Sequence, residues 1–393
     1  MKRKILIITP YLIQGGVEHS LITALSQIDY KKNDVILYLY KKGMDLLPQV
    51  PDEVNVIQGV DETHYYRKPL SLFFFGLSKL MKVLHIKKAE YKLLNKLYSY
   101  IHICKVYYPK RKILNDYSFD IVISYCLHLG TEIALTLNAE KHYLFLHNSH
   151  IDYHQDIFDK CKSGINSFFA VSKGVKDVYL STYSELSEKM YVINNYVDAP
   201  EVIAKSNEYS IKKTRSDNQR VLCTCGRLAT EKGFDLAVKT AAMLKNLGYS
   251  FYWFFVGDGY LRRNIENTIY KNGLEDYIEI TGFKENPYPY IAFSDIYVQP
   301  SYEESQGLAI YEALVLGKAV VSTDTIGGRC TLDFGNKGII TDISAEALAD
   351  GIKKLIDNEE LLCSYENRIT LEDNLREKQV YFEKWKKLLD GEY

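Results

Sequence analysis

The stretch from residue 296 to residue 322 constrains the fold of this chain more than any other. It reads as a strand over Ile296–Gln299, a turn, a helix from Leu308 to Leu316 and a second strand over Ala319–Ser322. Gly317 suits the C-terminal end of the helix, because glycine readily adopts the left-handed conformation that closes helices. A strand, a helix and a strand in this order predict one βαβ unit of a parallel sheet, in which ligands bind beyond the carboxyl ends of the strands.

The same alternation of strand and helix patterns runs through the whole chain, which predicts α/β layers. The other expected strands are Ile5–Ile8, Val35–Tyr40, Ile121–Tyr125, Tyr143–Leu146, Phe168–Val171, Val221–Thr224, Phe251–Val256 and Ile278–Thr281. The polar segment 199–219 divides them into two halves and reads as a linker. We therefore expect a first domain over 1–198, a second domain over 220–373 and a C-terminal segment over 374–393, with a helical pattern that runs from Leu371 to Leu389.

The composition is that of a globular protein without a dominant charge. The chain has 49 Lys and Arg against 50 Asp and Glu, so a global attraction to nucleic acid is not expected. No run of about 18 apolar residues occurs, which argues against a transmembrane helix. Scattered cysteines favour reduced thiols in the cytosol. The abundance of Tyr, Lys, Ile and Asn is typical of AT-biased, bacterial coding.

Two carboxylates in the opening stretch, Glu304 and Glu312, are separated by seven residues. Glu304 is expected at the mouth of the sheet and Glu312 about two turns along the helix. By itself this spacing also fits two glutamates on a helix surface. The following Ala-Leu-x-x-Gly-Lys-x-Val-Val makes the pattern more specific. The whole stretch resembles the Glu-x7-Glu signature of glycosyltransferase family 4, whose members are retaining enzymes of the GT-B fold.

This resemblance implies two Rossmann-like domains that face each other across a cleft, with a C-terminal helix returning to the first domain. It implies that Glu304 contacts the hydroxyls of the donor sugar and that Glu312 hydrogen-bonds the ribose of the nucleotide. The residues of the turn between them would complete the donor site, and these are Ser305, Gln306, Gly307 and Leu308. The family often has Phe at the position of Gln306.

A second loop, from Cys225 to Gly233, follows a strand, precedes a helix and contains Arg227 and Lys232. A diphosphate leaving group needs positive charge aimed at its oxygens, which Arg supplies through a bidentate fork and Lys through a point charge. Two solvated basic residues in a surface turn are the alternative. The loop resembles the Gly-Arg-Leu-x-x-x-Lys-Gly motif of the same family, in which Arg and Lys bind the donor diphosphate. The resemblance implies a reaction that needs no metal, and no Asp-x-Asp motif lies in a suitable loop.

Two further family marks complete the predicted donor site. Gly15-Gly16, after the first strand, matches the glycine loop that lies beside the donor phosphate, where a helix N-terminus favours an anion. A plain turn is an equally good interpretation of Gly15-Gly16 alone. Phe283 and Lys284 occupy the place of the loop that contacts the nucleotide base through its backbone.

Histidines provide candidates for the reacting centre. The family has a histidine at a similar strand end that hydrogen-bonds the primary hydroxyl of the sugar, and His147 is the candidate for this position. His128 is its rival, and a satisfied structural histidine is the common alternative for both. His150 and Asp152 could line the acceptor site.

Residues 65–112 form a basic and aromatic segment that includes Phe73-Phe74-Phe75 and twelve Lys or Arg against Glu90 alone. Such a stretch is typical of an element that lies on an anionic membrane. A solvated helix pair is the alternative, and nucleic-acid binding is disfavoured because no recognition motif accompanies the segment.

Together these features predict a retaining glycosyltransferase, cytoplasmic and peripheral at the inner face of the membrane, without a cofactor. It would transfer a sugar from a nucleoside-diphosphate donor, with a UDP-sugar favoured, to a lipid-linked or saccharide acceptor in surface polysaccharide or glycolipid synthesis. A GT-B nucleotide-sugar epimerase and a non-catalytic membrane scaffold are the alternatives. The chain departs from the family at Asn194-Asn195-Tyr196, where Pro-Asn-Gly is common, and lacks the acidic residue often found near 327–331.

Overall fold

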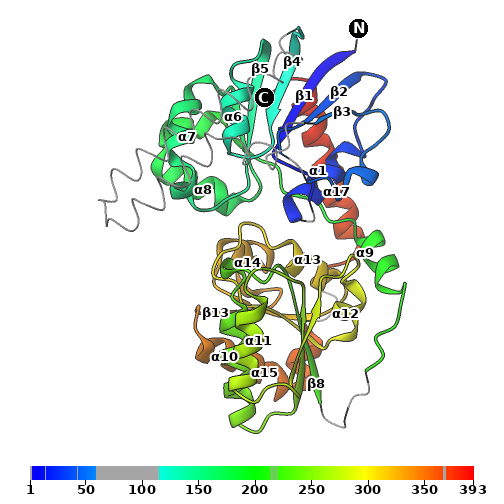
Figure 1. The fold of residues 1–393 in the computed structure, drawn as a ribbon, viewed down its shortest axis with the longest axis vertical. Coiled ribbons are helices and arrows are strands. Elements are labelled where there is room, and N and C mark those ends of the chain that lie inside the picture. Colours follow the sequence, from blue (N-terminus) through cyan, green and yellow to red (C-terminus); the bar gives the residue numbers. More distant parts are fainter. Residues whose placement is uncertain are drawn as a thin grey trace, which may run out of the picture.

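The computed structural model describes residues 2–58 except 14 and 42, residue 114, residues 116–365 except 214, 215, 217 and 218, and residues 369–393. Within these residues the chain forms two α/β domains stacked one above the other (Figure 1). Segment 65–112, predicted to contact a membrane, lies outside the described residues.

The first domain is built on a parallel sheet of seven described strands. In spatial order they are β3 (Asn55–Gln58), β2 (Asn33–Leu39), β1 (Arg3–Thr9), β4 (Phe119–Ser124), β5 (Ala139–Leu146), β6 (Ser167–Ala170) and β7 (Met190–Val192). Its described helices are α1 (Gly16–Leu25), α6 (Leu129–Ala134), α7 (Gln155–Cys161) and α8 (Lys173–Thr182). The strands are nearly continuous apolar runs because helices cover parallel sheets on both faces.

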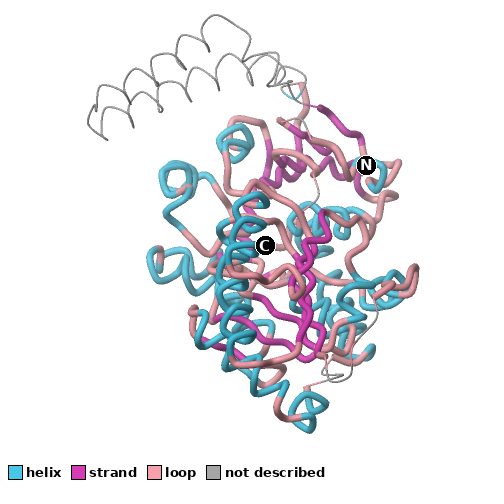
Figure 2. Tube along the Cα trace, turned by 60° about the horizontal axis from the view of Figure 1, so that its bottom comes forward, coloured by secondary structure: helices cyan, strands magenta, loops and turns pink. Residues whose placement is uncertain are grey.

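The second domain repeats this plan with a parallel sheet of six described strands. Their order is β10 (Ile278–Gly282), β9 (Phe251–Val256), β8 (Arg220–Cys225), β11 (Ile296–Gln299), β12 (Ala319–Thr323) and β13 (Ile339–Thr341). Its helices are α10 (Phe234–Asn246), α11 (Arg262–Lys271), α12 (Tyr288–Phe293), α13 (Leu308–Val315), α14 (Ile326–Thr331), α15 (Ala345–Ile356) and α16 (Glu359–Ser364). Figure 2 shows the strands in magenta with helices in cyan around them.

The described residues on either side of two segments show the chain passing from one domain to the other. The first crossover follows β7, and the segment predicted as a linker there includes helix α9 (Ala199–Ser206), which packs against α12 and α13. Asp198 caps this helix by accepting a hydrogen bond from the N–H of Glu201, and Pro200 lies in its first turn. The second crossover leads into helix α17 (Leu371–Leu389).

Helix α17 returns to the first domain, as predicted. Its buried face contributes Tyr381, Trp385, Leu388 and Leu389 to the core of that domain. The ring of Trp385 stacks on Phe145 with 5.3 Å between centroids. The C-terminal residue follows the helix to the first sheet, where Lys141 Nζ donates to the carbonyl oxygen of Tyr393 at 2.9 Å. The last helix therefore closes the first domain.

Candidate active site

The candidate active site lies where β8 and β11 end side by side in the second sheet. These strands are parallel neighbours, so the loops that follow them open on the same edge. The loop after β8 runs over 226–233 and the loop after β11 over 300–307. The N–H groups of Tyr302 and Glu303 donate to the carbonyl oxygen of Glu231 at 2.9 and 3.2 Å. The two loops are thereby held against each other.

Gly233 allows this close approach. It has a φ of +64°, and a Cβ at this position would lie 1.9 Å from the carbonyl oxygen of Pro300. A side chain at 233 would push the two loops apart. The glycine therefore lets Lys232, the preceding residue, face the loop after β11.

Lys232 and Glu304 form an ion pair at this point. Lys232 Nζ lies 2.7 Å from Glu304 Oε2, and the two side chains are only 22% and 14% exposed. Gln299 Nε2 and Ser301 Oγ lie 3.4 Å from the same carboxylate oxygen. The predicted sugar-binding carboxylate and the predicted phosphate-binding ammonium group are direct neighbours.

A buried chain of hydrogen bonds supports Glu304 from below. The hydroxyl of Tyr297 donates to Gln299 Oε1 at 2.8 Å, and Gln299 Nε2 donates to Ser301 Oγ at 2.8 Å. All three residues are at most 2% exposed. This support was not predicted from the sequence, although a glutamine at the end of an apolar strand is a signal for it.

Arg227 lies in the same loop as Lys232 and is far more exposed. Its side chain is 67% exposed, and its Nη2 lies 3.1 Å from Glu231 Oε1. Such an exposed pair contributes little to stability. The guanidinium group is accordingly accessible to a ligand at the edge of the sheet.

Glu312 lies inside α13 and is partly buried. The hydroxyl of Tyr288, on α12, donates to Glu312 Oε1 at 3.1 Å. Burial raises the pKa of Glu312 to about 7, against the opposing effects of the Tyr288 hydrogen bond and of Lys205. The carboxyl group therefore changes charge near neutral pH. Its hydrogen-bond donor, Tyr288, was not predicted from the sequence.

The first domain faces this site with the start of α1. A Cβ on Gly16 would lie 3.3 Å from Leu308 Cδ1, so the N-termini of α1 and α13 meet across the domain interface. Glu18 in the first turn of α1 is 8% exposed, and burial raises its pKa while the charge of Arg227 acts in the opposite direction. The predicted phosphate loop of the second domain therefore affects the pKa of Glu18, a carboxylate of the first domain, through the charge of Arg227.

His150 links the predicted acceptor side to the same loop. Its Nε2 lies 3.4 Å from Oε1 of Glu303, the residue before Glu304, which gives an ion pair when the imidazole is protonated. Asp152, its companion in the prediction, lies in the short helical turn Ile151–Tyr153 that follows.

The two candidate histidines lie in different surroundings. His147 follows β5 and packs against the ring of Tyr125 with 4.9 Å between centroids. Burial lowers its pKa to about 4, so its imidazole is neutral at neutral pH. His128 Nδ1 lies 2.8 Å from the hydroxyl of Tyr40, and burial also lowers its pKa to about 4. His128 thus has the partner expected of a structural histidine.

The remaining predicted donor residues lie at the ends of β10 and β11. Phe283, just after β10, is 56% exposed, and Lys284 Nζ lies 5.7 Å from the ring centroid of Tyr290. Ser305 and Gln306, by contrast, turn to the first domain. The carbonyl oxygen of Ser305 accepts a hydrogen bond from Ser172 Oγ at 2.8 Å.

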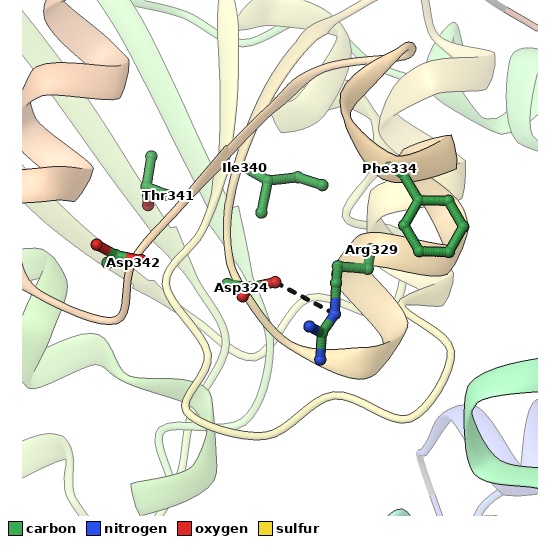
Figure 3. A pocket seen from close by; sticks show the side chains of 6 residues that line it. All are labelled: Asp324, Arg329, Phe334, Ile340, Thr341 and Asp342. Carbon is green, nitrogen blue, oxygen red and sulfur yellow. Dashed lines mark ion pairs between the residues drawn. The ribbon is translucent and has the colours of Figure 1, made fainter. Parts of the chain in front are cut away.

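A shallow pocket lies beyond the carboxyl ends of β12 and β13 (Figure 3). Strand β12 is the neighbour of β11, which leads into the loop with Glu304. The pocket is lined by Asp324, Arg329, Phe334, Ile340, Thr341 and Asp342. Arg329 Nε lies 3.2 Å from Asp324 Oδ1. The pocket extends the polar edge of the sheet away from Lys232.

The sequence of this chain is similar to those of known glycosyltransferases. Residues 205–371 match the family model of Glycosyl transferases group 1. The chain is 30% identical over 148 residues to an alpha-D-kanosaminyltransferase of Streptomyces kanamyceticus. That match covers 37% of this chain and 38% of the relative. It is 26% identical over 200 residues to an N-acetylgalactosamine-N,N'-diacetylbacillosaminyl-diphospho-undecaprenol 4-alpha-N-acetylgalactosaminyltransferase of Campylobacter jejuni, covering 50% of this chain and 52% of the relative.

The fold is similar to that of solved GT-B structures over almost the whole chain. HepE of Anabaena, in complex with UDP and glucose, superposes with a TM-score of 0.67 at 18% identity and covers 97% of this chain and 99% of its own. Together with the family match, this confirms the predicted GT-B fold and the predicted resemblance to glycosyltransferases. The chain spans about half or less of the length of the two curated relatives named above.

Proposed function

We propose that this protein, whose second domain matches the group 1 glycosyltransferases, is a retaining enzyme of glycosyltransferase family 4. It transfers a sugar from a nucleoside diphosphate, with UDP favoured, to a lipid-linked or saccharide acceptor in surface polysaccharide or glycolipid synthesis. The contact that carries this proposal is the ion pair of Lys232 and Glu304, 2.7 Å apart at the carboxyl ends of β8 and β11. It places a cation for a leaving phosphate beside a carboxylate for sugar hydroxyls.

The diphosphate binds at Lys232 and Arg227. A phosphate oxygen at Lys232 Nζ replaces the carboxylate of Glu304 as the partner of the ammonium group, and the exposed guanidinium of Arg227 provides a bidentate contact. Positive charge held at this place stabilises the charge that develops on the departing diphosphate. The two basic residues do the work that a metal ion does in other transferases.

Glu304, released from Lys232, accepts hydrogen bonds from hydroxyls of the donor sugar. Gln299 and Ser301 keep its carboxylate in position from the buried side. Glu304 orients the sugar and is not a nucleophile. The acceptor hydroxyl attacks the anomeric carbon on the face from which the diphosphate leaves, the bond from that carbon to the phosphate oxygen breaks, and the hydroxyl proton passes to the departing phosphate. The neutral imidazole of His147 receives or donates a hydrogen bond at the primary hydroxyl of the sugar.

The nucleoside lies further along the edge of the second sheet. Glu312, together with Tyr288, binds the ribose, and the backbone at Phe283 and Lys284 contacts the base. In this assignment 220–373 is the donor domain, whereas 1–198 with the final helix 374–393 is the acceptor domain. Gly16, at the start of α1, borders the phosphate from the acceptor side.

The acceptor assignment has two supports. The Campylobacter relative is named for a diphospho-undecaprenol acceptor, which is a lipid-linked saccharide. Segment 65–112 of this chain is basic and aromatic, as expected of an element at an anionic membrane surface. From this segment we propose a peripheral attachment at the inner face of the membrane. None of the described helices combines the length and the apolar character that a membrane span requires.

Thermal unfolding of the purified protein with UDP, GDP, ADP and their common sugars, in the presence of EDTA, tests the donor site. A nucleotide at a hundred times its dissociation constant adds about 2.7 kcal/mol of stability. We expect UDP to raise the melting temperature in wild type and to do so much less in Arg227→Ala. Turnover of the nucleotide sugar without any acceptor would favour an epimerase, and no response to any nucleotide would favour a scaffold.

A further inference from the structure

Gln306 joins the loop that carries Glu304 to the first crossover between the domains. Its Oε1 accepts a hydrogen bond from the N–H of Asn195 at 2.9 Å, and its Nε2 donates to the carbonyl oxygen of Asn195 at 2.8 Å. One amide side chain therefore satisfies both backbone groups of a single residue, as the backbone of a neighbouring strand would. An apolar side chain at position 306 cannot form this pair.

The Asn195 end of the pair is fixed to the first domain. Ser20, on α1, donates from its hydroxyl to Asn195 Oδ1 at 2.5 Å and lies 2.8 Å from the hydroxyl of Tyr125 at the end of β4. Ser20 and Tyr125 are both buried. Because of these contacts, a movement of Asn195 also moves α1 and the end of β4 in the first sheet.

The Gln306 end of the pair is fixed within the second domain. The carbonyl oxygen of Gln306 accepts a hydrogen bond from Thr331 Oγ1 on α14. The carbonyl oxygen of Glu304 accepts one from the N–H of Gly327, also on α14, at 2.7 Å. The loop that orients Glu304 is thus continuous with the contact to Asn195.

A second junction ties α13 to the same crossover. Asn374, on α17 and fully buried, donates from Nδ2 to the carbonyl oxygen of Val197 at 2.8 Å and to the hydroxyl of Tyr311 at 3.2 Å. Tyr311 directly precedes Glu312. The segment that contains both Glu304 and Glu312 is therefore attached to residues 195–197 at two points. One is Gln306, which precedes α13, and the other is Tyr311, which lies within α13.

We propose that Gln306 is a positioning residue that couples the donor-sugar loop to the arrangement of the two domains. Its pairing with Asn195 keeps Glu304 in position to contact the donor sugar. This pairing requires the crossover to have the position that it has in this structure. The inference rests on the proposed function, because it presumes that Glu304 faces a donor sugar. Binding of a nucleoside diphosphate at Lys232 and Glu312 is then transmitted through Gln306 to the crossover.

Hydrogen exchange of the backbone amides of residues 193–198, followed by mass spectrometry with and without saturating UDP, tests this coupling. In wild type we expect UDP to slow exchange of this segment. In Gln306→Leu we expect exchange without UDP to be faster by about tenfold or more, because the N–H of Asn195 loses its acceptor. We also expect saturating UDP to leave this exchange unchanged in the variant, with the UDP affinity measured in parallel so that the concentration is saturating for each protein.

Two further variants make the result specific. Asn195→Ala removes the contact to Ser20 but keeps the backbone groups that pair with Gln306, so UDP should still slow exchange. Gln306→Glu keeps the acceptor for the N–H of Asn195 and loses the donor, so it should lie between wild type and the leucine variant. This variant also serves if Gln306→Leu does not fold.

Three outcomes decide the matter. Unchanged exchange in Gln306→Leu without UDP would overturn the pairing. Faster exchange that UDP still slows as much as in wild type would make Gln306 a structural contact only and would overturn the coupling. If the wild-type protein binds none of UDP, GDP and ADP, the proposed function fails instead. The two failures can be told apart, because exchange in wild type and in Gln306→Leu without UDP still reports on the pairing of Gln306 with Asn195.

Discussion

Lys232 Nζ lies 2.7 Å from Glu304 Oε2, so the cation and the carboxylate of the proposed site neutralise each other in this structure. Both side chains are largely shielded from solvent, which strengthens their interaction relative to a surface pair. A donor that binds here has to separate them. The pair therefore makes the phosphate subsite and the sugar subsite depend on each other.

Glu304→Gln should separate nucleotide binding from turnover. The amide no longer competes with phosphate for Lys232, so the affinity for UDP should stay the same or increase. Turnover should fall by roughly 10²–10³-fold if Glu304 contacts the sugar in the transition state. Calorimetry with UDP and release of UDP from the sugar donor measure the two effects. Glu303→Gln removes a neighbouring charge and is the matched control, and a loss of UDP affinity in Glu304→Gln would contradict the assignment.

Arg227→Ala should reduce turnover without reducing stability. The side chain is 67% exposed, and its ion pair among the described residues is with Glu231 four residues away, so the free energy of unfolding should change by less than about 0.5 kcal/mol. Arg376→Ala, which breaks a similarly exposed pair with Glu372 on α17, is the control. Denaturant unfolding and steady-state kinetics measure the two quantities. Equal kinetics in the two variants would remove Arg227 from the site.

Glu312 should make the stability of the fold depend on pH. Its pKa in the folded state is about 7, raised by burial above the ordinary value of 4.5. The stabilisation associated with its protonated form is complete below about pH 4.5 and is lost as the pH rises through 7. From pH 5 to pH 8 this loss is on the order of 3 kcal/mol. Glu312→Gln cannot ionise, so its free energy of unfolding should exceed that of wild type at pH 8 and approach it near pH 5. Parallel pH profiles for the two proteins would contradict this.

The sequence predicted most of the fold because long apolar strands and capped helices are local signals. Ile296–Gln299 and Phe251–Val256 were predicted with the bounds that the structure gives, and so was the final helix. The missed strands β3, β7 and β13 are short edge strands. Asn55–Gln58 has no buried residue, and so few apolar side chains leave little pattern to read.

The candidate site, like the fold, was predicted in part. The loops with Arg227, Lys232 and Glu304 were found because the motif of each loop is one continuous stretch of the sequence. Tyr288 and Asn195 were not, because their partners Glu312 and Gln306 come from elements far along the chain. Gln306 was predicted to face the donor, whereas its side chain pairs with the backbone of the interdomain crossover. No local pattern specifies which way a loop amide turns.

The basic segment 65–112 should attach the protein to anionic membranes. Each Lys or Arg near such a surface adds about 1 kcal/mol of attraction. Replacing Lys82, Lys87, Lys88 and Lys92 by Gln should therefore release the protein from vesicles that contain phosphatidylglycerol at physiological salt. Replacing four Lys of the second domain, Lys239, Lys271, Lys353 and Lys354, is the control for net charge. Undiminished sedimentation of the first variant with the vesicles would favour a solvated helix pair.

Trp385 should secure the returning helix to the first domain. The side chain is 4% exposed and lies against Phe145 and Tyr125, with centroid distances of 5.3 and 6.3 Å. Trp385→Ala should lower the free energy of unfolding by about 3–5 kcal/mol, because it leaves a cavity among these rings. Leu375→Ala, on the same helix but 52% exposed, should change it by less than about 0.5 kcal/mol. Urea denaturation followed by circular dichroism measures both, and equal midpoints would mean that the helix contributes no core packing to the first domain.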